Sequence, residues 1–228
     1  MPIHVLTKLL FRHSHWPHRF LSTAAWIIGL RPRVTGHRAG SHTLLVANHT
    51  SWLDILILGG ALRSTFVSKA ELGHPLIHWL ADQNSTVYVR RTERKAAREQ
   101  AVAVAAALEG TKPVTIFPEG TTGPGTHLLP FRSTLLEAAN FAAKDVAIRP
   151  VVMDYGPAAA EIGWYHEPGK NNVLRLLGRK GTLPVIVHLL PALDRAADRK
   201  QLSQSAREAI AERLRFKSDV HSPIGEPE

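Results

Sequence analysis

The sequence contains no cysteine, which excludes disulfide bonds, thiolate nucleophiles and cysteine-ligated zinc sites. It has no run of about 18 consecutive apolar residues, so we expect no membrane-spanning helix. Basic residues also interrupt the apolar N-terminal stretch, so we expect no cleavable signal peptide. What is present is an ordinary globular composition, 44% hydrophobic and 21% charged, and the length of 228 residues suits one domain, or one domain with an appendage.

Acidic residues are missing from the first part of the chain, because the first one is Asp54. Residues 1–53 carry six of the 28 Lys and Arg residues, in a chain whose net charge is +9. Apolar residues recur there with the spacing of one helical face, at Phe20, Leu21, Ala24, Ala25 and Ile28. A basic amphipathic helix near tryptophans is typical of a membrane interface, where anionic lipid attracts each base by about 1 kcal/mol. The alternative is a surface helix that packs this apolar face on its own domain.

Nucleic acid is the other common partner of a basic protein. The sequence shows no recognisable nucleic-acid-binding motif, and aromatic residues make up only 7% of it. We therefore expect an anionic membrane surface, and no nucleic acid, as the partner of the basic region.

Short apolar runs alternate with amphipathic helical patterns along the rest of the chain. The runs predict strands at residues 43–47, 64–68, 86–89, 114–117, 147–152 and 184–190. The amphipathic patterns predict helices at residues 52–62, 94–109, 134–143 and 198–216. Strands that alternate with helices predict a layered α/β fold with a mixed or parallel sheet.

His49 and Asp54 follow the first of these strands and are five residues apart. On a continuous helix this offset would turn the two side chains about 140° apart, so they can pair only across a turn. In that arrangement the carboxylate would keep one ring nitrogen protonated and leave the other free to accept a proton, as a general base requires. The alternative for Asp54 is a helix-capping box with Ser51.

Two further segments place polar side chains where expected strands end. Glu119 can accept a hydrogen bond from a substrate hydroxyl or from the backbone, and Gly120 lets the chain turn close to a ligand. Arg91 follows another strand, and a guanidinium group suits an anionic headgroup. The alternatives are a Pro-Glu-Gly turn that only ends a strand, and solvated charge at the start of a helix.

In order and spacing, these segments resemble the glycerolipid acyltransferases of the bacterial 1-acylglycerol-3-phosphate acyltransferase type. The family's first block, Asn-His-x-x-x-x-Asp, is matched at residues 48–54, and its third block, Phe-Pro-Glu-Gly-Thr, at residues 117–121. Its second block ends a short strand with an arginine, here Arg91, and its fourth is an apolar strand around a proline, here residues 148–152. The segment that ends at Lys69 resembles the stretch between the first two blocks.

The resemblance implies a glycerol-3-phosphate acyltransferase-like layered α/β fold, with a mixed, mostly parallel sheet flanked by helices and an N-terminal amphipathic helical segment. We accordingly expect a basic membrane-docking segment at residues 1–40 and an acyltransferase domain at residues 41–190. A C-terminal helix and a frayed tail occupy residues 191–228 in this division. The enzyme would lie at the cytoplasmic face of the cell membrane as a peripheral or monotopic protein.

The resemblance also implies the reaction. His49 would deprotonate the hydroxyl of a lysolipid such as 1-acylglycerol-3-phosphate, and Asp54 would orient and support the imidazolium. The alkoxide would attack the thioester of acyl-CoA or acyl carrier protein directly, with no metal and no further cofactor. The residues implied in binding substrate are Arg91, Glu119, Gly120 and Thr121, with Lys69 and Arg132 as further candidates for anionic groups.

One position departs from the family's phosphatidate-forming members, which usually carry arginine directly after Glu-Gly-Thr. This chain has Thr122 there, and the segment looks more like members that acylate lyso-ornithine lipid. Both acceptors therefore stay open. Two other hypotheses also stay open: a covalent mechanism in which His49 activates Ser51 to carry the acyl group, and a non-enzymatic basic protein that binds membranes.

Overall fold

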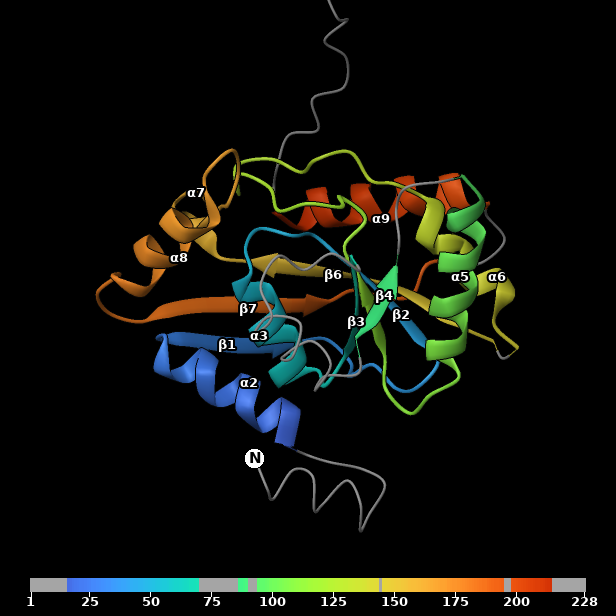
Figure 1. The fold of residues 1–228 in the computed structure, drawn as a ribbon, viewed down its shortest axis with the longest axis horizontal. Helices are drawn as coiled ribbons and strands as arrows, with labels where there is room; N and C mark the ends of the chain where they lie inside the picture. Colours follow the sequence, from blue (N-terminus) through green and yellow to red (C-terminus); the bar gives the residue numbers. More distant parts are fainter. Residues whose placement is uncertain (1–15, 70–85, 90–93, 144, 195–197, 215–228) are drawn as a thin grey trace, which may run out of the picture.

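The computed structural model describes residues 16–69, 86–89, 94–143, 145–194 and 198–214 (Figure 1). These residues form one seven-stranded sheet in the order β1-β7-β6-β2-β5-β3-β4. The strands are β1 (Leu30–Thr35), β2 (Thr43–Ala47), β3 (Thr65–Lys69), β4 (Val87–Val89), β5 (Val114–Ile116), β6 (Ala147–Asp154) and β7 (Leu183–Leu189). All neighbouring strands are parallel except β6 and β7. The expected mixed, mostly parallel α/β sheet is confirmed.

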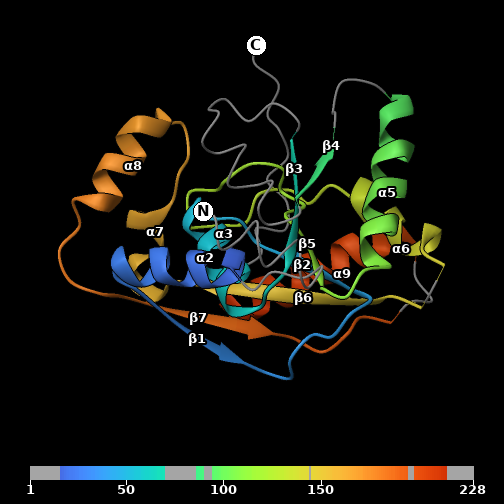
Figure 2. The ribbon, with the colours of Figure 1, turned by 60° about the horizontal axis from the view of Figure 1, so that its bottom comes forward.

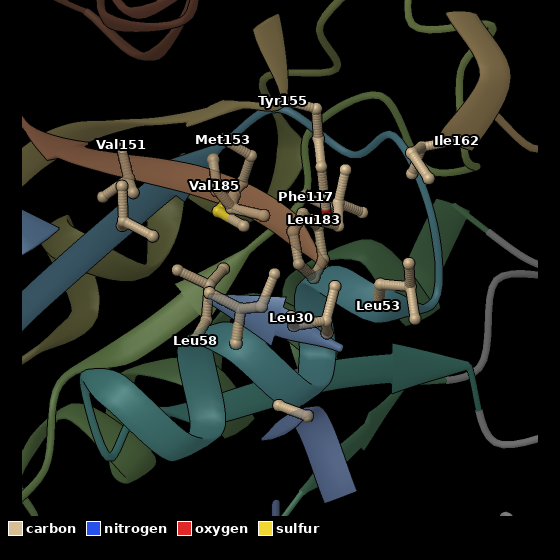
Figure 3. Close-up of a cluster of buried hydrophobic side chains, with 14 of the residues drawn as sticks. Leu30, Leu53, Leu58, Phe117, Val151, Met153, Tyr155, Ile162, Leu183 and Val185 are labelled. Carbon is tan, nitrogen blue, oxygen red and sulfur yellow. The ribbon is translucent and has the colours of Figure 1, made fainter. Parts of the chain in front are cut away.

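Helices cover both faces of the sheet (Figures 1 and 2). The helices are α2 (Trp16–Ile27), α3 (Leu53–Ala61), α5 (Arg94–Leu108), α6 (Ala138–Phe141), α7 (Ala159–Ile162), α8 (Gly169–Leu177) and α9 (Arg199–Leu214), with 3-10 turns at Thr134–Glu137 and Gly156–Ala158. Leu45 of β2 packs into a cluster with α2, α3, α7 and α8 (Figure 3), whereas Leu44 and Val46 pack with α5, α6 and α9. Because both faces are covered, β2 is buried throughout, and it is apolar from Leu44 to Ala47.

The N-terminal residues of the described chain are built into this fold. Helix α2 packs against α3 and buries Leu21 and Ala25. The two helices approach closely at Gly60, where a Cβ atom would lie 2.7 Å from the hydroxyl oxygen of Ser22. Residues 30–35, which the sequence analysis placed in the docking segment, form the edge strand β1 and pair in parallel with β7. The described part of the docking segment is therefore also part of the structural core.

A second apolar face of α2 points to solvent. Trp16, Phe20 and Ile27 are 43%, 49% and 71% exposed and project within an arc of about 40° on the helix. Trp26 is also exposed, and the guanidinium of Arg31 lies 5.2 Å from its ring centroid. The two alternatives for this helix thus correspond to two different faces, and membrane docking by the outer face stays a prediction. In the part of the chain that the structure describes, no helix is long and apolar enough to cross a membrane.

The direction of the strands decides where polar residues gather. Strands β2, β3, β4, β5 and β6 run the same way, so their carboxyl ends lie at one edge of the sheet. His49, Glu119 and Tyr155 each follow closely after one of these ends, at β2, β5 and β6. Ligands of open α/β sheets bind at such an edge.

Candidate active site

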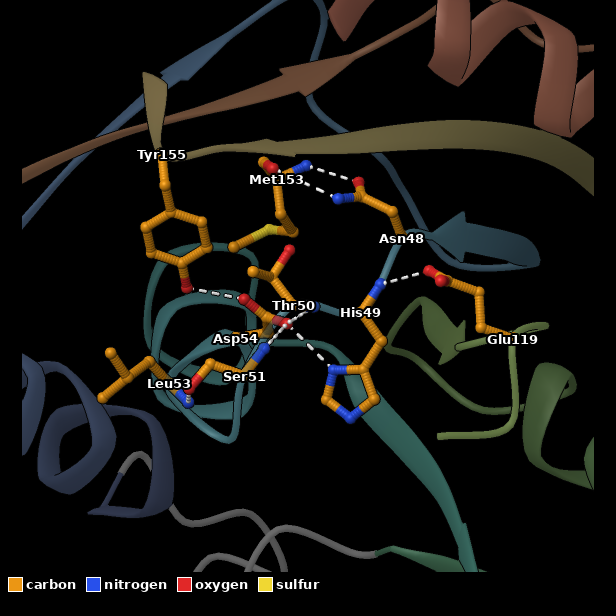
Figure 4. A network of polar contacts seen from close by, with 9 residues as sticks. All are labelled: Asn48, His49, Thr50, Ser51, Leu53, Asp54, Glu119, Met153 and Tyr155. Carbon is orange, nitrogen blue, oxygen red and sulfur yellow. Dashed lines mark hydrogen bonds and ion pairs between the residues drawn. The ribbon is translucent and has the colours of Figure 1, made fainter. Parts of the chain in front are cut away.

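His49 lies in the turn between β2 and α3, and Asp54 lies in the first turn of α3. The ring Nδ1 of His49 lies 2.8 Å from Oδ2 of Asp54 (Figure 4). The turn between them provides the contact that a continuous helix would not allow. The imidazole side chain is 16% exposed, and its Nε2 points away from the carboxylate. With the Nδ1 proton donated to Asp54, Nε2 is the atom that can accept a proton.

The carboxylate of Asp54 is fully buried and accepts hydrogen bonds on both oxygens. Besides His49, Oδ2 accepts from the backbone N–H groups of Thr50 at 2.7 Å and Ser51 at 3.0 Å. Oδ1 accepts from the hydroxyl of Tyr155 at 2.6 Å. Asp54 therefore contacts both the imidazole of His49 and the backbone N–H groups just before α3, although no side-chain hydrogen bond caps that helix at its N-cap residue, Trp52.

The loop after β5 contacts the backbone N–H, the carbonyl and the ring of His49. Oε1 of Glu119 accepts the backbone N–H of His49 at 2.7 Å, and the N–H of Gly123 donates to the His49 carbonyl at 2.7 Å. The imidazole stacks on the ring of Phe117, with centroids 3.9 Å apart. The first and third family blocks therefore meet in space, and the third block fixes the position of the imidazole.

Glu119 is occupied by backbone groups on both carboxylate oxygens. Its Oε2 accepts the N–H of Leu129 at 3.0 Å, while Oε1 accepts from His49. Burial raises the pKa of Glu119 to about 7, although both backbone hydrogen bonds oppose that rise. We call the two backbone hydrogen bonds that Glu119 accepts, from His49 and Leu129, the clamp on His49. A neutral carboxyl group carries a proton on one oxygen and accepts two N–H donors less well, so the clamp is strongest above about pH 7. A direct contact of Glu119 with substrate stays a prediction.

Asn48 joins the start of the turn between β2 and α3 to the neighbouring strand β6. Its side-chain amide donates to the carbonyl of Met153 at 3.2 Å, and its side-chain oxygen accepts the N–H of the same residue at 2.8 Å. The side chain thus continues the β2–β6 pairing by one step beyond the ladder. The asparagine of the first block therefore has a structural role, because its contact with Met153 fixes the backbone position from which His49 follows.

The other residues predicted to bind substrate are placed less directly around His49 and Asp54. Gly120 has a φ of +74°, a conformation that favours glycine, and it follows Glu119 directly. The side chains of Thr121 and Arg132 are exposed. Lys69 ends β3 with its side chain outside the described residues, and Arg91 lies outside them altogether. The binding roles of these residues stay predictions.

The structure speaks against Ser51 as an acyl carrier. Its side chain is fully buried, and its hydroxyl oxygen accepts the N–H of Leu53 at 3.4 Å. A residue that accepts an acyl group from a large thioester must be reachable from outside, which Ser51 is not. Direct transfer to the acceptor fits this geometry better than a covalent intermediate.

Sequence analysis missed Tyr155, which contributes the fourth hydrogen bond to Asp54. A signal was present, because the residue follows an apolar strand, and strands beside β2 in a parallel sheet end next to His49. The predicted strand stopped at Val152, whereas β6 continues to Asp154, so the tyrosine was not placed at the strand end.

A small cavity lies next to these residues. His49, Glu119 and Tyr155 are among the residues that line a cavity of about 20 Å³, which is room for about one water molecule. Over the described ranges, no group of three or more His, Asp or Glu side chains is placed to hold a metal ion.

The fold and site together define an α/β protein with a histidine–aspartate dyad at the carboxyl edge of its sheet. The structure is similar to the crystal structure of the 1-acyl-sn-glycerophosphate (LPA) acyltransferase PlsC from Thermotoga maritima. The TM-score is 0.64, and the match covers 95% of this chain and 88% of that chain. At 20% sequence identity this likeness establishes the fold.

The family model described as Acyltransferase matches residues 31–154. The chain is 33% identical to the lyso-ornithine lipid O-acyltransferase of Rhodobacter capsulatus, over 92% of this chain and 83% of that protein. It is also 33% identical to the enzyme of the same name from Rhizobium meliloti, over 96% and 83%. A 1-acyl-sn-glycerol-3-phosphate acyltransferase of Neisseria gonorrhoeae is 32% identical over 64% of this chain and 54% of that protein. The chain belongs to the acyltransferase family and is an acyltransferase, as the resemblance implied.

Proposed function

We propose that the protein is a lysolipid O-acyltransferase in which His49 is the general base and Asp54 holds it. The observation that carries the proposal is the 2.8 Å contact between Nδ1 of His49 and Asp54, which leaves Nε2 directed away from the carboxylate. A base in this arrangement removes a hydroxyl proton at neutral pH without a metal ion.

The transfer proceeds by addition and elimination. Nε2 of His49 takes the proton of the acceptor hydroxyl while that oxygen attacks the thioester carbonyl carbon of acyl-CoA or acyl carrier protein. The tetrahedral adduct then collapses, the carbon–sulfur bond breaks, and the thiolate leaves with the proton from the imidazolium. The products are the ester and the free thiol, and the negative charge of Asp54 stabilises the imidazolium between the two steps.

Lyso-ornithine lipid is the acceptor that we favour over lysophosphatidic acid. Two relatives that match more than 90% of this chain carry the name lyso-ornithine lipid O-acyltransferase. Thr122 also favours lyso-ornithine lipid, because a neutral hydroxyl replaces the arginine that phosphatidate-forming members place after Glu-Gly-Thr.

An acceptor panel tests both the reaction and its acceptor. We expect thiol release from acyl-CoA with lyso-ornithine lipid to exceed release with lysophosphatidic acid. Thr122→Arg adds a guanidinium group that pairs with a phosphate, so the ratio of rates should move toward lysophosphatidic acid by about tenfold or more. Thr126→Arg, at an exposed position of the same loop, is the matched control for added charge. Thiol release with neither acceptor would contradict both acceptor assignments.

We also propose that the outer face of α2 docks the enzyme on the cytoplasmic face of an anionic membrane. Phe20 and Ile27 are exposed on that face, and the basic residues of the N-terminal region add electrostatic attraction. The double variant Phe20→Ser/Ile27→Ser should bind phosphatidylglycerol-containing vesicles about tenfold less tightly, as measured by sedimentation.

The matched control for docking is Leu174→Ser/Leu177→Ser on α8, where the two leucines are 59% and 55% exposed. We expect this control to retain vesicle binding. Both variants should keep thiol release with a water-soluble short-chain acceptor, since neither touches the dyad. An equal loss of binding in the two variants would contradict docking through α2.

A further inference from the structure

Tyr155 is a buried phenol that contacts the dyad from a different strand. It follows β6 directly, whereas His49 and Asp54 lie in the turn after β2 and at the start of α3. Its side chain is 3% exposed, and its hydroxyl donates to Oδ1 of Asp54 at 2.6 Å (Figure 4). The contact therefore ties the carboxylate of α3 to the central sheet.

The hydroxyl supplies a hydrogen bond that no other described residue gives to this oxygen. Oδ2 of Asp54 receives three donors, from His49, Thr50 and Ser51. Among the residues that the structure describes, Oδ1 receives only Tyr155. A fully buried carboxylate oxygen without a donor would be costly, so the phenol completes the set of donors that holds Oδ2 toward the imidazole.

The phenol is held in its protonated, hydrogen-bond-donating form. Complete burial raises the pKa of Tyr155 well above its ordinary value, and the negative charge of Asp54 and the hydrogen bond to it act in the same direction. The hydroxyl is therefore protonated at neutral pH, and its partial positive charge acts on the carboxylate.

We propose that Tyr155 is a positioning residue of the acyl transfer, acting on His49 through Asp54. It holds Oδ2 toward Nδ1 of His49, and it draws negative charge toward Oδ1, which limits how strongly the carboxylate favours the imidazolium. The proposal rests on the proposed function for its kinetic part, but the charge effect is a property of the resting protein.

Other titratable groups lie close to His49 in space or next to Tyr155 along the chain. Glu119 lies on the loop after β5 and contacts the backbone of His49. Asp154 precedes Tyr155 and lies 3.6 Å from His188, which in turn contacts Arg213 of α9 at 3.1 Å. All of these remain in a variant of Tyr155, so a difference from the wild type isolates the phenol.

The experiment compares the wild type with Tyr155→Phe, which removes only the hydroxyl. The ring ¹⁵N signals of His49 are followed by NMR from pH 5 to 9, and kcat and KM for the acceptor are measured over the same range. Without the hydroxyl, the carboxylate charge acts more fully on the imidazole, so the titration midpoint and the acidic limb of kcat should both move to higher pH. The plateau kcat should fall about tenfold, because Oδ2 is held less well, with KM nearly unchanged.

Tyr165→Phe, at an exposed tyrosine, is the matched control and should change none of these values. An unchanged titration midpoint in Tyr155→Phe overturns the proposal, whatever the enzyme's activity. If the variant is too unstable to study, 3,5-difluorotyrosine at position 155 keeps the hydroxyl and strengthens its donation, so the midpoint should move to lower pH. Absence of acyl transfer in the wild type would remove the proposed function, while the NMR result would still decide the charge effect.

Discussion

Replacing His49 by alanine is expected to lower kcat for acyl transfer by about 10³- to 10⁴-fold, because the ring nitrogen directed away from Asp54, which is the proposed proton acceptor, is lost. The fold should survive, since the imidazole is at the edge of the core and its main packing contact is the ring of Phe117. Thiol release with the lysolipid acceptor measures the loss, and far-ultraviolet circular dichroism checks the fold.

Two companion variants make this result specific. Asp54→Asn keeps the volume of the buried side chain but no longer supports an imidazolium, so kcat should also fall by several orders of magnitude, up to about 10⁴-fold by analogy with hydrolase triads. His37→Ala removes an exposed histidine and should leave kcat unchanged. Near-full activity in the folded His49→Ala protein would remove the imidazole as the base.

The sequence was most informative where chemistry and local structure coincide. Residues 43–47 form a strand because both of its faces are covered, which requires an unbroken apolar run that is easy to recognise. The turn that follows places His49 and Asp54 in contact, and that contact follows from their spacing once the helix starts between them. The meeting of the first and third family blocks follows from the parallel order of β2 and β5.

Other parts of the fold carry weak local signals. Strand β1 contains Pro32 and two arginines and has one fully buried residue, a composition that suits an edge strand but does not alternate clearly. Helix α8 begins with Gly169 and includes two asparagines, so its helix propensity is low. Both elements exist because of tertiary partners, β7 for the strand and the core around Leu176 for the helix.

The long-range contacts of the site also cannot be predicted from a single sequence. Glu119 could accept from a substrate hydroxyl or from the backbone, and in the structure both of its oxygens accept backbone N–H groups, one of them from a residue 70 positions away. Tyr155 lies 101 positions from the carboxylate it contacts. Such pairs depend on strand order, which local patterns of hydrophobicity do not specify.

Glu119→Gln is expected to change how stability depends on pH. Burial raises the pKa of this carboxyl group in the folded protein from 4.5 to about 7. Between these values the native state keeps a proton that the unfolded chain has released, so the wild type loses stability as the pH rises through this window. The loss amounts to about 3 kcal/mol and levels off above pH 7, while the glutamine variant has no proton to release at this position.

Urea unfolding of both proteins at several pH values from 5 to 8 measures the effect as a difference. The free energy of unfolding of the wild type should decline relative to that of Glu119→Gln as the pH rises, even if the variant is less stable overall because an amide cannot accept both N–H groups. Glu208→Gln, at an exposed position of α9, removes a carboxylate from the surface and is the matched control. Parallel stability curves for the wild type and Glu119→Gln would mean that the carboxyl group is already ionised throughout this range. In that case the clamp on His49 would hold equally well in acid, and the expected weakening of the site below pH 7 would not occur.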